Sequence, residues 1–419
     1  MKRKTFEDWP RVRHGLRCVG LLIGAAVATT SHAQDLDTKR FTLRGFGTLA
    51  ATTHDGEGIE FRRSAEQARG VAKGDIELYT DSLAGLQMGV ELGPHFEVVA
   101  QGVMRMQSDG DWNPRLSQGF VRYSPDEALV FRAGRIGYDI YLMAESRQVG
   151  YSYLTLRPPP DFYGMVTNDQ VDGADMSVTR RAGRGLVRAR VFAGRGYSDT
   201  AFADQTHTET DGKIVGATVD YLYRGWTARV ALIRFSFDAD PGIAPLVGAL
   251  RATGMPQAES IADNLDHKIC RTLGMQIGVA YDDGPLEAQL LYGMVNASSM
   301  IAPEFDKGYF LLGYRLHQWT PFASFATSRD RNAIRSAGLP DIPQLAPLEG
   351  AVRTLQESSR STQHTASVGA RYDFSEHVDI KIQLDRVSLR DSTMNFDRRV
   401  PPGGPIEFTA LAASIDFVF

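Results

Sequence analysis

The last twelve residues, Phe408 to Phe419, read FTALAASIDFVF. Every second residue from Thr409 onward is Thr, Leu, Ala, Ile or Phe, whereas the alternate positions carry Ala, Ser, Val and a single acid, Asp416. Such alternation predicts a β-strand with one apolar face. About ten residues of this kind are long enough for a tilted strand to cross a bilayer. The segment therefore predicts a strand of membrane-spanning length.

The other end of the chain has the features of an export signal. A basic stretch is followed by an apolar run from Val19 to Ala28, and Ser31-His32-Ala33 then precedes Gln34 as a small-x-small cleavage site. The sequence therefore predicts a cleaved signal peptide at 1–33 and one β-barrel domain at 34–419. Loss of six basic and two acidic residues with the signal changes the net charge from −4 to −8, which argues against nucleic acid as a partner.

Composition limits how the remaining chain could enter a membrane. No stretch after the signal approaches the roughly twenty apolar residues of a spanning helix, so only a closed barrel could satisfy the backbone in lipid. Cys270 is left alone once Cys18 is removed, which excludes a disulfide framework. The histidines, of which His364 and His377 are examples, lack the spacing of paired ligands. We therefore expect no metal and no cofactor.

Alternation bounded by turn residues recurs along the whole chain. It predicts sixteen strands near 40–51, 82–92, 96–106, 115–123, 128–137, 173–181, 186–196, 214–223, 226–237, 271–282, 286–297, 306–317, 319–329, 364–374, 378–390 and 407–419. The expected fold class is therefore all-β, an antiparallel transmembrane barrel. We expect the last strand to close it by pairing with Arg40 to Ala51, which leaves no exposed edge.

The predicted connections alternate between tight turns and long loops. Gly93-Pro94-His95 and Arg224-Gly225 are examples of the tight class. The long class comprises 52–81, 107–114, 138–172, 197–213, 238–270, 298–305, 330–363 and 391–406. An even-stranded membrane barrel with both termini on the periplasmic side produces this rhythm. Within the fifth long connection, Pro241 to Asn264 is interpreted as a folded surface loop, with a short helix as the alternative.

The hairpin at 366–384 predicts what each face of the barrel meets. Its apolar positions, such as Val368 and Ile382, alternate with polar positions, such as Arg371 and Lys381. Alternation alone would also suit a soluble barrel with an apolar interior. The export signal and the terminal Phe419 favour lipid on the apolar face and water on the polar face.

Taken together, these segments resemble the Gram-negative outer-membrane porins of the sixteen-stranded, usually trimeric type. The resemblance rests on the SHA-Q site, the opening strand FTLRGFGTLA, the segment VRYSPDEALVFRAGRIGYDIYLMAESRQVGYSYLTLRPPPDFYG, the hairpin GARYDFSEHVDIKIQLDRV and the final FVF. It implies passive diffusion of small hydrophilic solutes, a homotrimer, and outer-membrane lipid and lipopolysaccharide as surroundings. It also implies that the third long loop folds into the barrel and narrows the pore.

The third long connection, Gly137 to Asp172, suits that role. A loop of about thirty-five residues is usually functional or disordered, and its aromatic side chains, such as Tyr141 and Phe162, argue against disorder. The run Arg157-Pro158-Pro159-Pro160 is stiff and extended. We therefore expect this loop to form the constriction.

Strand phases give candidate pore-lining residues. The predicted lumen side carries Arg44, Arg105, Arg122, Arg132, Arg188 and Arg190, with Arg315 and Arg371 as weaker members, and the third loop offers Asp139, Glu145, Asp161, Asp169 and Asp172. Opposed charges across a narrow aqueous gap would set up a transverse field and select solutes. Alternatively, the arginines only solvate the wall and pair with nearby carboxylates. Arg135 and Arg234 fall out of the expected phase.

Three functions remain open from the sequence. The first is a weakly selective porin, and the second is a channel selective for anions such as phosphate, sulfate or carboxylates. The third is an outer-membrane enzyme, but His364 and Ser361 show no pattern that fixes a catalytic geometry, so we expect no enzymatic activity. A receptor with an N-terminal plug is excluded because the first strand begins within about ten residues of the expected cleavage site.

Overall fold

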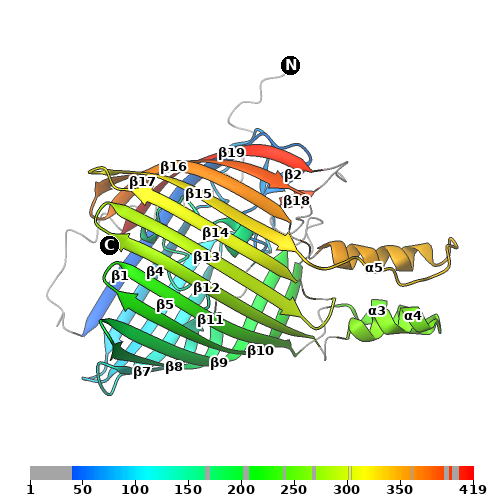
Figure 1. Cartoon of the computed structure of the whole chain (residues 1–419), viewed down its shortest axis with the longest axis horizontal. Helices are drawn as coiled ribbons and strands as arrows, with labels where there is room; N and C mark the ends of the chain where they lie inside the picture. The colour runs from blue at the N-terminus through cyan, green and yellow to red at the C-terminus, as the bar shows by residue number, and fades with distance from the viewer. Residues whose placement is uncertain are drawn as a thin grey trace.

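The computed structural model describes residues 40–165, 170–201, 207–238, 242–266, 270–300, 302, 304–358, 360, 362–390, 396–398 and 405–419. The expected signal peptide at 1–33 lies outside this range. Within it, sixteen antiparallel strands form one closed barrel (Figure 1). They are β1 (Phe41–His54), β4 (Leu83–Glu91), β5 (Phe96–Arg105), β6 (Pro114–Tyr123), β7 (Leu129–Gly137), β8 (Gln170–Ala182), β9 (Gly185–Ala201), β10 (His207–Tyr223), β11 (Trp226–Phe237), β12 (Arg271–Asp283), β13 (Leu286–Ala297), β14 (Phe305–Tyr314), β15 (Trp319–Asp330), β16 (Gln363–Ser375), β17 (Val378–Leu389) and β19 (Ile406–Val418).

The two ends of the strand sequence close the barrel, as predicted. β1 pairs with β19 in a register that sets Thr48 opposite Asp416. The backbones of Gly45 and Phe419 exchange two hydrogen bonds, each 3.0 Å from nitrogen to oxygen. A Cβ at Gly45 would overlap the Phe419 ring, so glycine permits this close approach. Closure leaves no free edge in the sixteen-stranded sheet.

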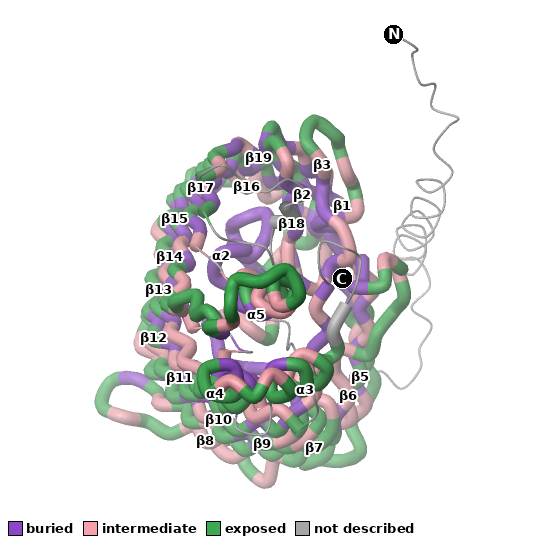
Figure 2. The backbone as a smooth tube through the Cα atoms, turned by 90° about the vertical axis from the view of Figure 1, so that its right-hand side faces the viewer, coloured by how far each residue is buried: buried purple, intermediate pink, exposed green. Residues whose placement is uncertain are grey.

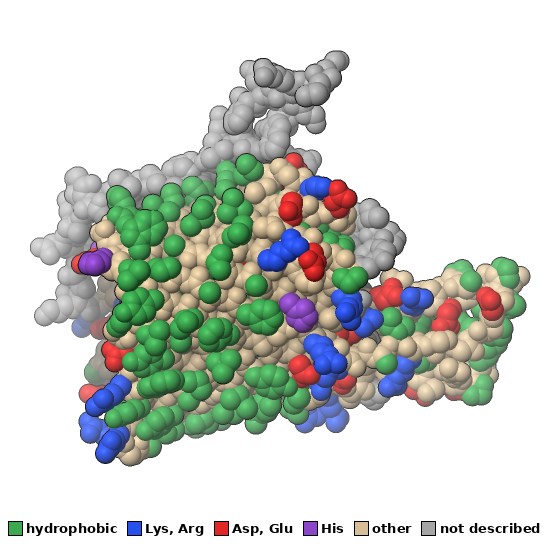
Figure 3. Space-filling view, turned by 45° about the horizontal axis from the view of Figure 1, so that its top comes forward, with side chains coloured by type: hydrophobic (Ala, Val, Ile, Leu, Met, Phe, Trp, Pro, Cys, Tyr) green, Lys and Arg blue, Asp and Glu red, His purple; other side chains and the backbone are tan. Residues whose placement is uncertain are grey.

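The two faces of the barrel differ as the hairpin pattern predicted. In β16 and β17 the outward Val368 and Ile382 are exposed, whereas the inward Asp379 and Lys381 are buried. Figure 3 shows hydrophobic side chains gathered in a band on the outer surface, with charged side chains toward both ends of the barrel. An apolar outside and a polar inside are the inverse of a soluble barrel. In the described part of the chain, no helix is both long and apolar enough to cross a membrane.

The long connections contain structure that the sequence analysis did not predict. The short strands β2 (Ile59–Phe61), β3 (Val71–Ala72) and β18 (Phe396–Arg398) form a separate sheet. The fifth connection, interpreted as a folded surface loop, instead forms two helices, α3 (Ala244–Ala252) and α4 (Pro256–Asn264), and the seventh contains α5 (Ala346–Ser358). That interpretation was wrong because Pro256 occupies the first turn of α4, where its missing N–H costs nothing.

These three helices extend beyond one end of the barrel (Figure 1). They share a hydrophobic core that includes Leu250, Ile261 and Val352 and lies apart from the core inside the barrel. Figure 2 looks onto this end and shows another helix, α2 (Pro160–Tyr163), inside the ring of strands. The third long connection, which contains α2, therefore enters the barrel as predicted.

Candidate constriction inside the barrel

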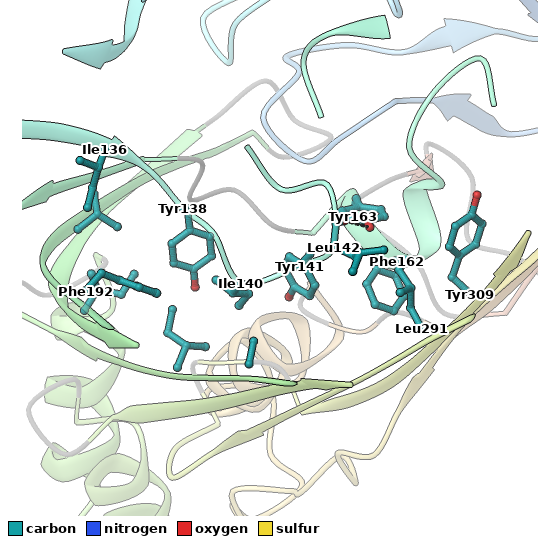
Figure 4. Packing of buried hydrophobic residues seen from close by; sticks show 14 of the residues in the cluster. Ile136, Tyr138, Ile140, Tyr141, Leu142, Phe162, Tyr163, Phe192, Leu291 and Tyr309 are labelled. Atoms are coloured by element: carbon teal, nitrogen blue, oxygen red, sulfur yellow. Dashed lines mark hydrogen bonds between the residues drawn. The ribbon is translucent and has the colours of Figure 1, made fainter. Parts of the chain in front are cut away.

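Residues 138–165, which we call the inner loop, pack their apolar side chains onto the inner wall. The loop contains a short 3-10 turn, Gly150–Ser152, as well as α2. The rings of Tyr141 and Phe162 meet edge to face with centroids 5.4 Å apart, and Phe162 lies 6.5 Å from Tyr309 of β14. Figure 4 shows this cluster extending to Phe192 of β9. Burial of these aromatic rings holds the loop inside the barrel.

Hydrogen bonds fix residues 150–156 of the inner loop to β16 and β17. Lys381 Nζ donates to the carbonyl of Gly150 at 2.7 Å, and Arg371 Nη1 donates to the carbonyl of Tyr151 at 2.8 Å. The backbone N–H of Leu156 donates to Gln383 Oε1 at 2.8 Å. Polar lumen-facing side chains thus satisfy backbone groups of a loop that has no sheet partner, as buried polar groups require.

Arg157 makes the most deeply buried attachment. Its side chain is 1% exposed, and Nε lies 2.9 Å from Asp81 Oδ1 while Nη1 lies 3.0 Å from Asp385 Oδ2. Nη2 also donates to Thr52 Oγ1 at 3.1 Å. A buried cation needs paired carboxylates and satisfied N–H groups to offset its desolvation. This guanidinium therefore connects the inner loop to β1, to β17 and to the segment before β4.

The first part of the inner loop, residues 139–145, contacts a cluster of arginines on the barrel wall. Asp139 lies 2.5 Å from Arg190 Nη1 and 2.5 Å from Arg229 Nη1. Glu145 lies 2.9 Å from Arg132 and 3.1 Å from Arg190. Two predicted acids of the loop and two predicted arginines of the wall are therefore brought together.

The wall supplies further acids to these arginines. Arg132 Nε lies 2.9 Å from Asp175 Oδ2, and Arg229 Nε lies 2.6 Å from Asp220 Oδ1. Together with Asp139 and Glu145, four carboxylates surround three guanidinium groups. These residues do not form the expected transverse field across an aqueous gap. Their carboxylates and guanidinium groups are in contact and compensate one another. The alternative, in which the arginines pair with neighbouring carboxylates, describes them.

The arginines also act on the ionisation of Glu145. Burial raises the pKa of this carboxyl, but the attraction of Arg190 and Arg132 outweighs burial, so its pKa lies below the usual value. Glu145 is therefore ionised at neutral pH, and the inner loop stays tied to the wall by charge.

The remaining predicted arginines lie on the lumen side in different settings. Arg105 pairs with Glu66 of the first long connection at 2.5 Å, and Arg122 pairs with Glu97 at 3.3 Å near a tight turn. The weaker members are also paired, Arg315 with Asp282 at 2.6 Å and Arg371 with Asp373 at 2.7 Å. Arg44 and Arg188 are exposed and form no ion pair with any residue that the structure describes.

Two predicted acids that the structure describes, Asp161 and Asp172, do not face the arginine cluster. Asp161 is buried beside β16, where Thr365 Oγ1 donates to it at 2.7 Å. Burial raises the pKa of Asp161 to about 7. Asp172 belongs to β8 and pairs with Arg135 at 2.7 Å on the outer face, so its assignment to the third loop is wrong. Asp169 lies outside the described residues.

Arg135 and Arg234 do not interrupt the alternation of their strands. Arg135 shares its parity with the exposed Phe131 in β7, and Arg234 shares its parity with the exposed Leu232 in β11. Both strands keep a regular alternation, and both arginines belong to the outer face.

Sequence reasoning missed several residues that hold the constriction, above all Arg229, Arg157 and Lys381. Arg229 could have been found, since Trp226, Val230 and Leu232 fix the outward parity of β11 and so place residue 229 inside. Arg157 gave no such signal because a loop has no period from which to read the direction of a side chain.

A polar cavity of about 50 Å³ lies between the inner loop and the wall. Its lining includes Arg105, Arg115, Ser117, Gln148, Gln170 and Asp199, which come from β5, β6, β8, β9 and the inner loop. A cavity of this size, lined by charged and amide side chains, suits a few water molecules. Among the described residues, no group of three or more His, Cys, Asp or Glu side chains could hold a metal ion, and Cys270 is buried and free.

Comparison with solved structures decides the fold. OmpF of Salmonella typhi, solved in complex with daunomycin, matches over 92% of this chain and 99% of its own, with a TM-score of 0.53 and 12% identity. The fold is that of the sixteen-stranded porins. An anion-selective porin from Comamonas acidovorans matches with a TM-score of 0.51 and 14% identity, covering 90% of this chain and 99% of the porin.

A third match to the porin fold is the outer-membrane channel DcaP of Acinetobacter baumannii. It has a TM-score of 0.50 and 10% identity, and the match covers 90% of this chain and 97% of DcaP. At these identities the likeness concerns the fold alone. No family model and no curated protein sequence matches the chain.

Proposed function

We propose that this chain forms a water-filled channel in the outer membrane of a Gram-negative bacterium, through which small hydrophilic solutes and ions diffuse passively. The observation that carries the proposal is the inner loop, which lies within a closed barrel whose outer face is apolar and whose inner face is polar. A loop fixed inside the barrel would narrow the path, and a polar cavity of about 50 Å³ lies beside Gln148. The proposal includes no enzymatic activity.

The channel is proposed to be weakly selective. Arg132, Arg190 and Arg229 would make a strongly basic constriction if they were unpaired, but each is in contact with carboxylates of the loop or the wall. Compensated pairs leave only a small net field in the water beside them. Selectivity at the narrowest point depends on that field and on the diameter, so neither ion sign is strongly favoured there.

An anion-selective channel is the second candidate. Arg44 and Arg188 face the lumen, are exposed, and form no ion pair within the described residues. Uncompensated cations in a water-filled barrel raise the local concentration of anions. This observation supports a moderate preference for anions, away from the inner loop, without a dedicated binding site.

Recording from planar bilayers tests the proposal. The full chain, refolded in detergent and added to a bilayer, is expected to give stepwise, ohmic conductance with a small reversal potential in a salt gradient. Saturation or block by a single anion would favour the second candidate. Absence of any conductance, in a preparation whose circular dichroism shows a folded β-barrel, would contradict both.

Processing and assembly are part of the same proposal. We propose that residues 1–33 are cleaved on export and that the barrel at 34–419 assembles as a homotrimer surrounded by lipid and lipopolysaccharide. N-terminal sequencing of the protein from outer-membrane fractions is expected to begin at Gln34. Mass measurement of the detergent-solubilised protein is expected to give three copies, and a single copy would contradict the trimer.

A further inference from the structure

The first long connection, between β1 and β4, also enters the barrel. Phe61 of β2 is 1% exposed and packs in a cluster with Val387 and Phe408, which point inward from β17 and β19. The guanidinium of Arg157 lies over the Phe61 ring, 4.7 Å from its centroid. Figure 2 shows β2 and β18 within the ring of strands. At β2 the connection therefore lies against the inner wall formed by β17 and β19.

Residues 62–68, which we call the crossing segment, leave this wall and reach β9. The side chain of Arg62 is fully buried, and its Nη1 donates to the carbonyl of Ala201, the last residue of β9, at 2.9 Å. The backbone N–H of Ala201 donates in turn to the carbonyl of Ala65 at 2.8 Å. The strands β4 to β8 fill the shorter arc of the barrel between β1 and β9. The crossing segment therefore spans the lumen at the helix-bearing end and separates this arc from the rest.

The crossing segment is bonded to the inner loop as well as to the wall. The backbone N–H of Ala65 donates to the carbonyl of Gly164 at 2.9 Å. Arg63 Nη2 donates to the carbonyl of Arg147 at 3.3 Å. Donors of one loop thus satisfy carbonyl groups of the other, as buried polar groups require. The two loops form two layers in contact, and the layer made by the first connection lies nearer the helix-bearing end.

The space left beside these layers differs between the two sides of the inner loop. Between the inner loop and β15 to β17 lies a cavity of about 10 Å³, close to the smallest volume that holds one water molecule. The polar cavity of about 50 Å³ lies on the other side, against β5, β6, β8 and β9. Its lining includes Glu66 of the crossing segment, which pairs with Arg105 of β5 at 2.5 Å. The crossing segment therefore forms one edge of the larger space.

We propose that the crossing segment forms a second constriction above the inner loop, that solutes pass it on the side of β5 and β6, and that Glu66 is a specificity-determining residue there. The inference rests on the proposed channel function. Diameter and charge at a narrow point decide which solutes and ions pass. Glu66 shares the cavity lining with Arg105 and Arg115, so its carboxylate offsets their charge along the path.

Planar-bilayer recording on the full chain tests the second constriction. Replacement of residues 59–72 by a short Gly-Ser link removes β2, β3 and the crossing segment, and is expected to raise the single-channel conductance at least about 1.5-fold because the mouth widens. The same link in place of 244–264 removes a longer segment outside the barrel and is expected to change the conductance much less. Unchanged conductance in the first variant, or an equal rise in both, would overturn the proposal.

Thiol labelling tests the position of the path without removing a loop. In a Cys18→Ser/Cys270→Ser background, Ser117→Cys places a thiol on β6 in the lining of the polar cavity. Ser367→Cys places one on β16, on the other side of the inner loop. A positively charged methanethiosulfonate reagent added during recording is expected to reduce the conductance of the Ser117→Cys variant alone. Any other pattern would contradict the assigned side.

Glu66→Gln tests the charge at the second constriction. Loss of the carboxylate is expected to raise the ratio of anion to cation permeability at least about twofold, as measured from the reversal potential in a salt gradient. Glu97→Gln is the matched control, since it removes a carboxylate paired with Arg122 at 3.3 Å near a tight turn at the opposite end of the barrel. An equal or larger change in the control would show that Glu66 does not determine specificity.

Failure of this inference can be told from failure of the proposed channel. Wild-type protein that is folded but never conducts refutes the channel, and the second constriction with it. Wild-type protein that conducts, together with variants of the crossing segment whose conductance and permeability ratio are unchanged, refutes the second constriction alone.

Discussion

Arg157 of the inner loop and Asp385 of β17 form an ion pair of 3.0 Å in which both side chains are almost fully buried. The two residues are 228 positions apart in the chain. Because the same guanidinium also contacts Asp81, one side chain joins three distant segments inside the barrel. The position of the constriction therefore depends on a contact that neither segment could make alone.

Replacement of Arg157 by Met is expected to detach this part of the inner loop. Two buried carboxylates, Asp81 and Asp385, would lose their cation, and breaking a buried pair in this way typically costs about 3–5 kcal/mol. Thermal unfolding followed by circular dichroism should show the loss of stability. Protease cleavage within 150–165 should become faster. The exposed pair Arg386–Glu407 supplies the control, since Arg386→Met should cost less than about 1 kcal/mol.

Charge reversal at Arg44 and Arg188 is expected to move the reversal potential toward cation preference. Both cations face the lumen without a paired carboxylate among the described residues, so Glu at these positions changes the field directly. Arg122→Gln, which removes an arginine already paired with Glu97, should shift the potential less. A larger shift in that control would show that the uncompensated arginines do not set selectivity.

Replacement of Asp161 by Asn is expected to change the pH dependence of the inner loop. The folded-state pKa is raised to about 7 by burial, whereas an unfolded Asp titrates near 3.9. The unfolded chain therefore binds fewer protons between these values, so the loop loses stability as pH rises from about 4 to 7 and loses no more above that. The loss is at most about 4 kcal/mol.

Hydrogen exchange of residues 155–164 should reveal this effect. Protection in wild type should be greater at pH 5 than at pH 8, and in Asp161→Asn it should vary little over the same range. The variant keeps an oxygen that can accept from Thr365. An equal pH dependence in both proteins would show that another group titrates.

Removal of the helices outside the barrel is expected to leave the barrel folded. The core of α3, α4 and α5 is separate from the cluster inside the barrel, and loops at a barrel end tolerate shortening. A variant with short Gly-Ser links in place of 244–264 and 334–358 should retain its resistance to unfolding by detergent at room temperature, as judged by gel mobility. Loss of that resistance would mean that the helices brace the strands.

Replacement of Gly45 by Leu is expected to destabilise the seam between β1 and β19. Any side chain there must displace the ring of Phe419, and overpacking of this kind typically costs about 1–3 kcal/mol. The double variant Gly45→Leu/Phe419→Ala should recover part of the stability in thermal unfolding. No recovery would show that the ring is not what excludes a side chain from this position.

The strands could be predicted because each carries its own signal. β11 and β13 have the predicted ends, and β19 has the predicted partner, since alternation and turn residues are local properties. The predicted strand at 306–317 runs too far, because β14 ends at Tyr314 and His317 adopts a positive φ of 59° in the turn that follows. Such a conformation is not visible in hydrophobic periodicity.

The constriction could be predicted only in part. The aromatic content of the inner loop indicated that it would be buried, and strand parity placed Arg132 and Arg190 on the lumen side. Their partners were not predictable, since Asp139 and Glu145 lie in a loop whose path depends on contacts such as Lys381 with Gly150. The sequence therefore predicted which charged residues face the lumen, but not which carboxylates pair with the arginines.

The seam between β1 and β19 joins residues near opposite ends of the barrel sequence, as in the pairing of Phe46 with Val418. Every other pairing in the barrel joins strands that follow one another along the chain, apart from the short strands β2, β3 and β18 that lie outside the barrel sheet. Sheet closure is thus the one pairing of very high sequence separation, and it bears the largest loop-closure entropy. Until the last strand arrives, two open edges stay available to other chains. The interval before closure is when this protein is most prone to aggregate and most dependent on assistance.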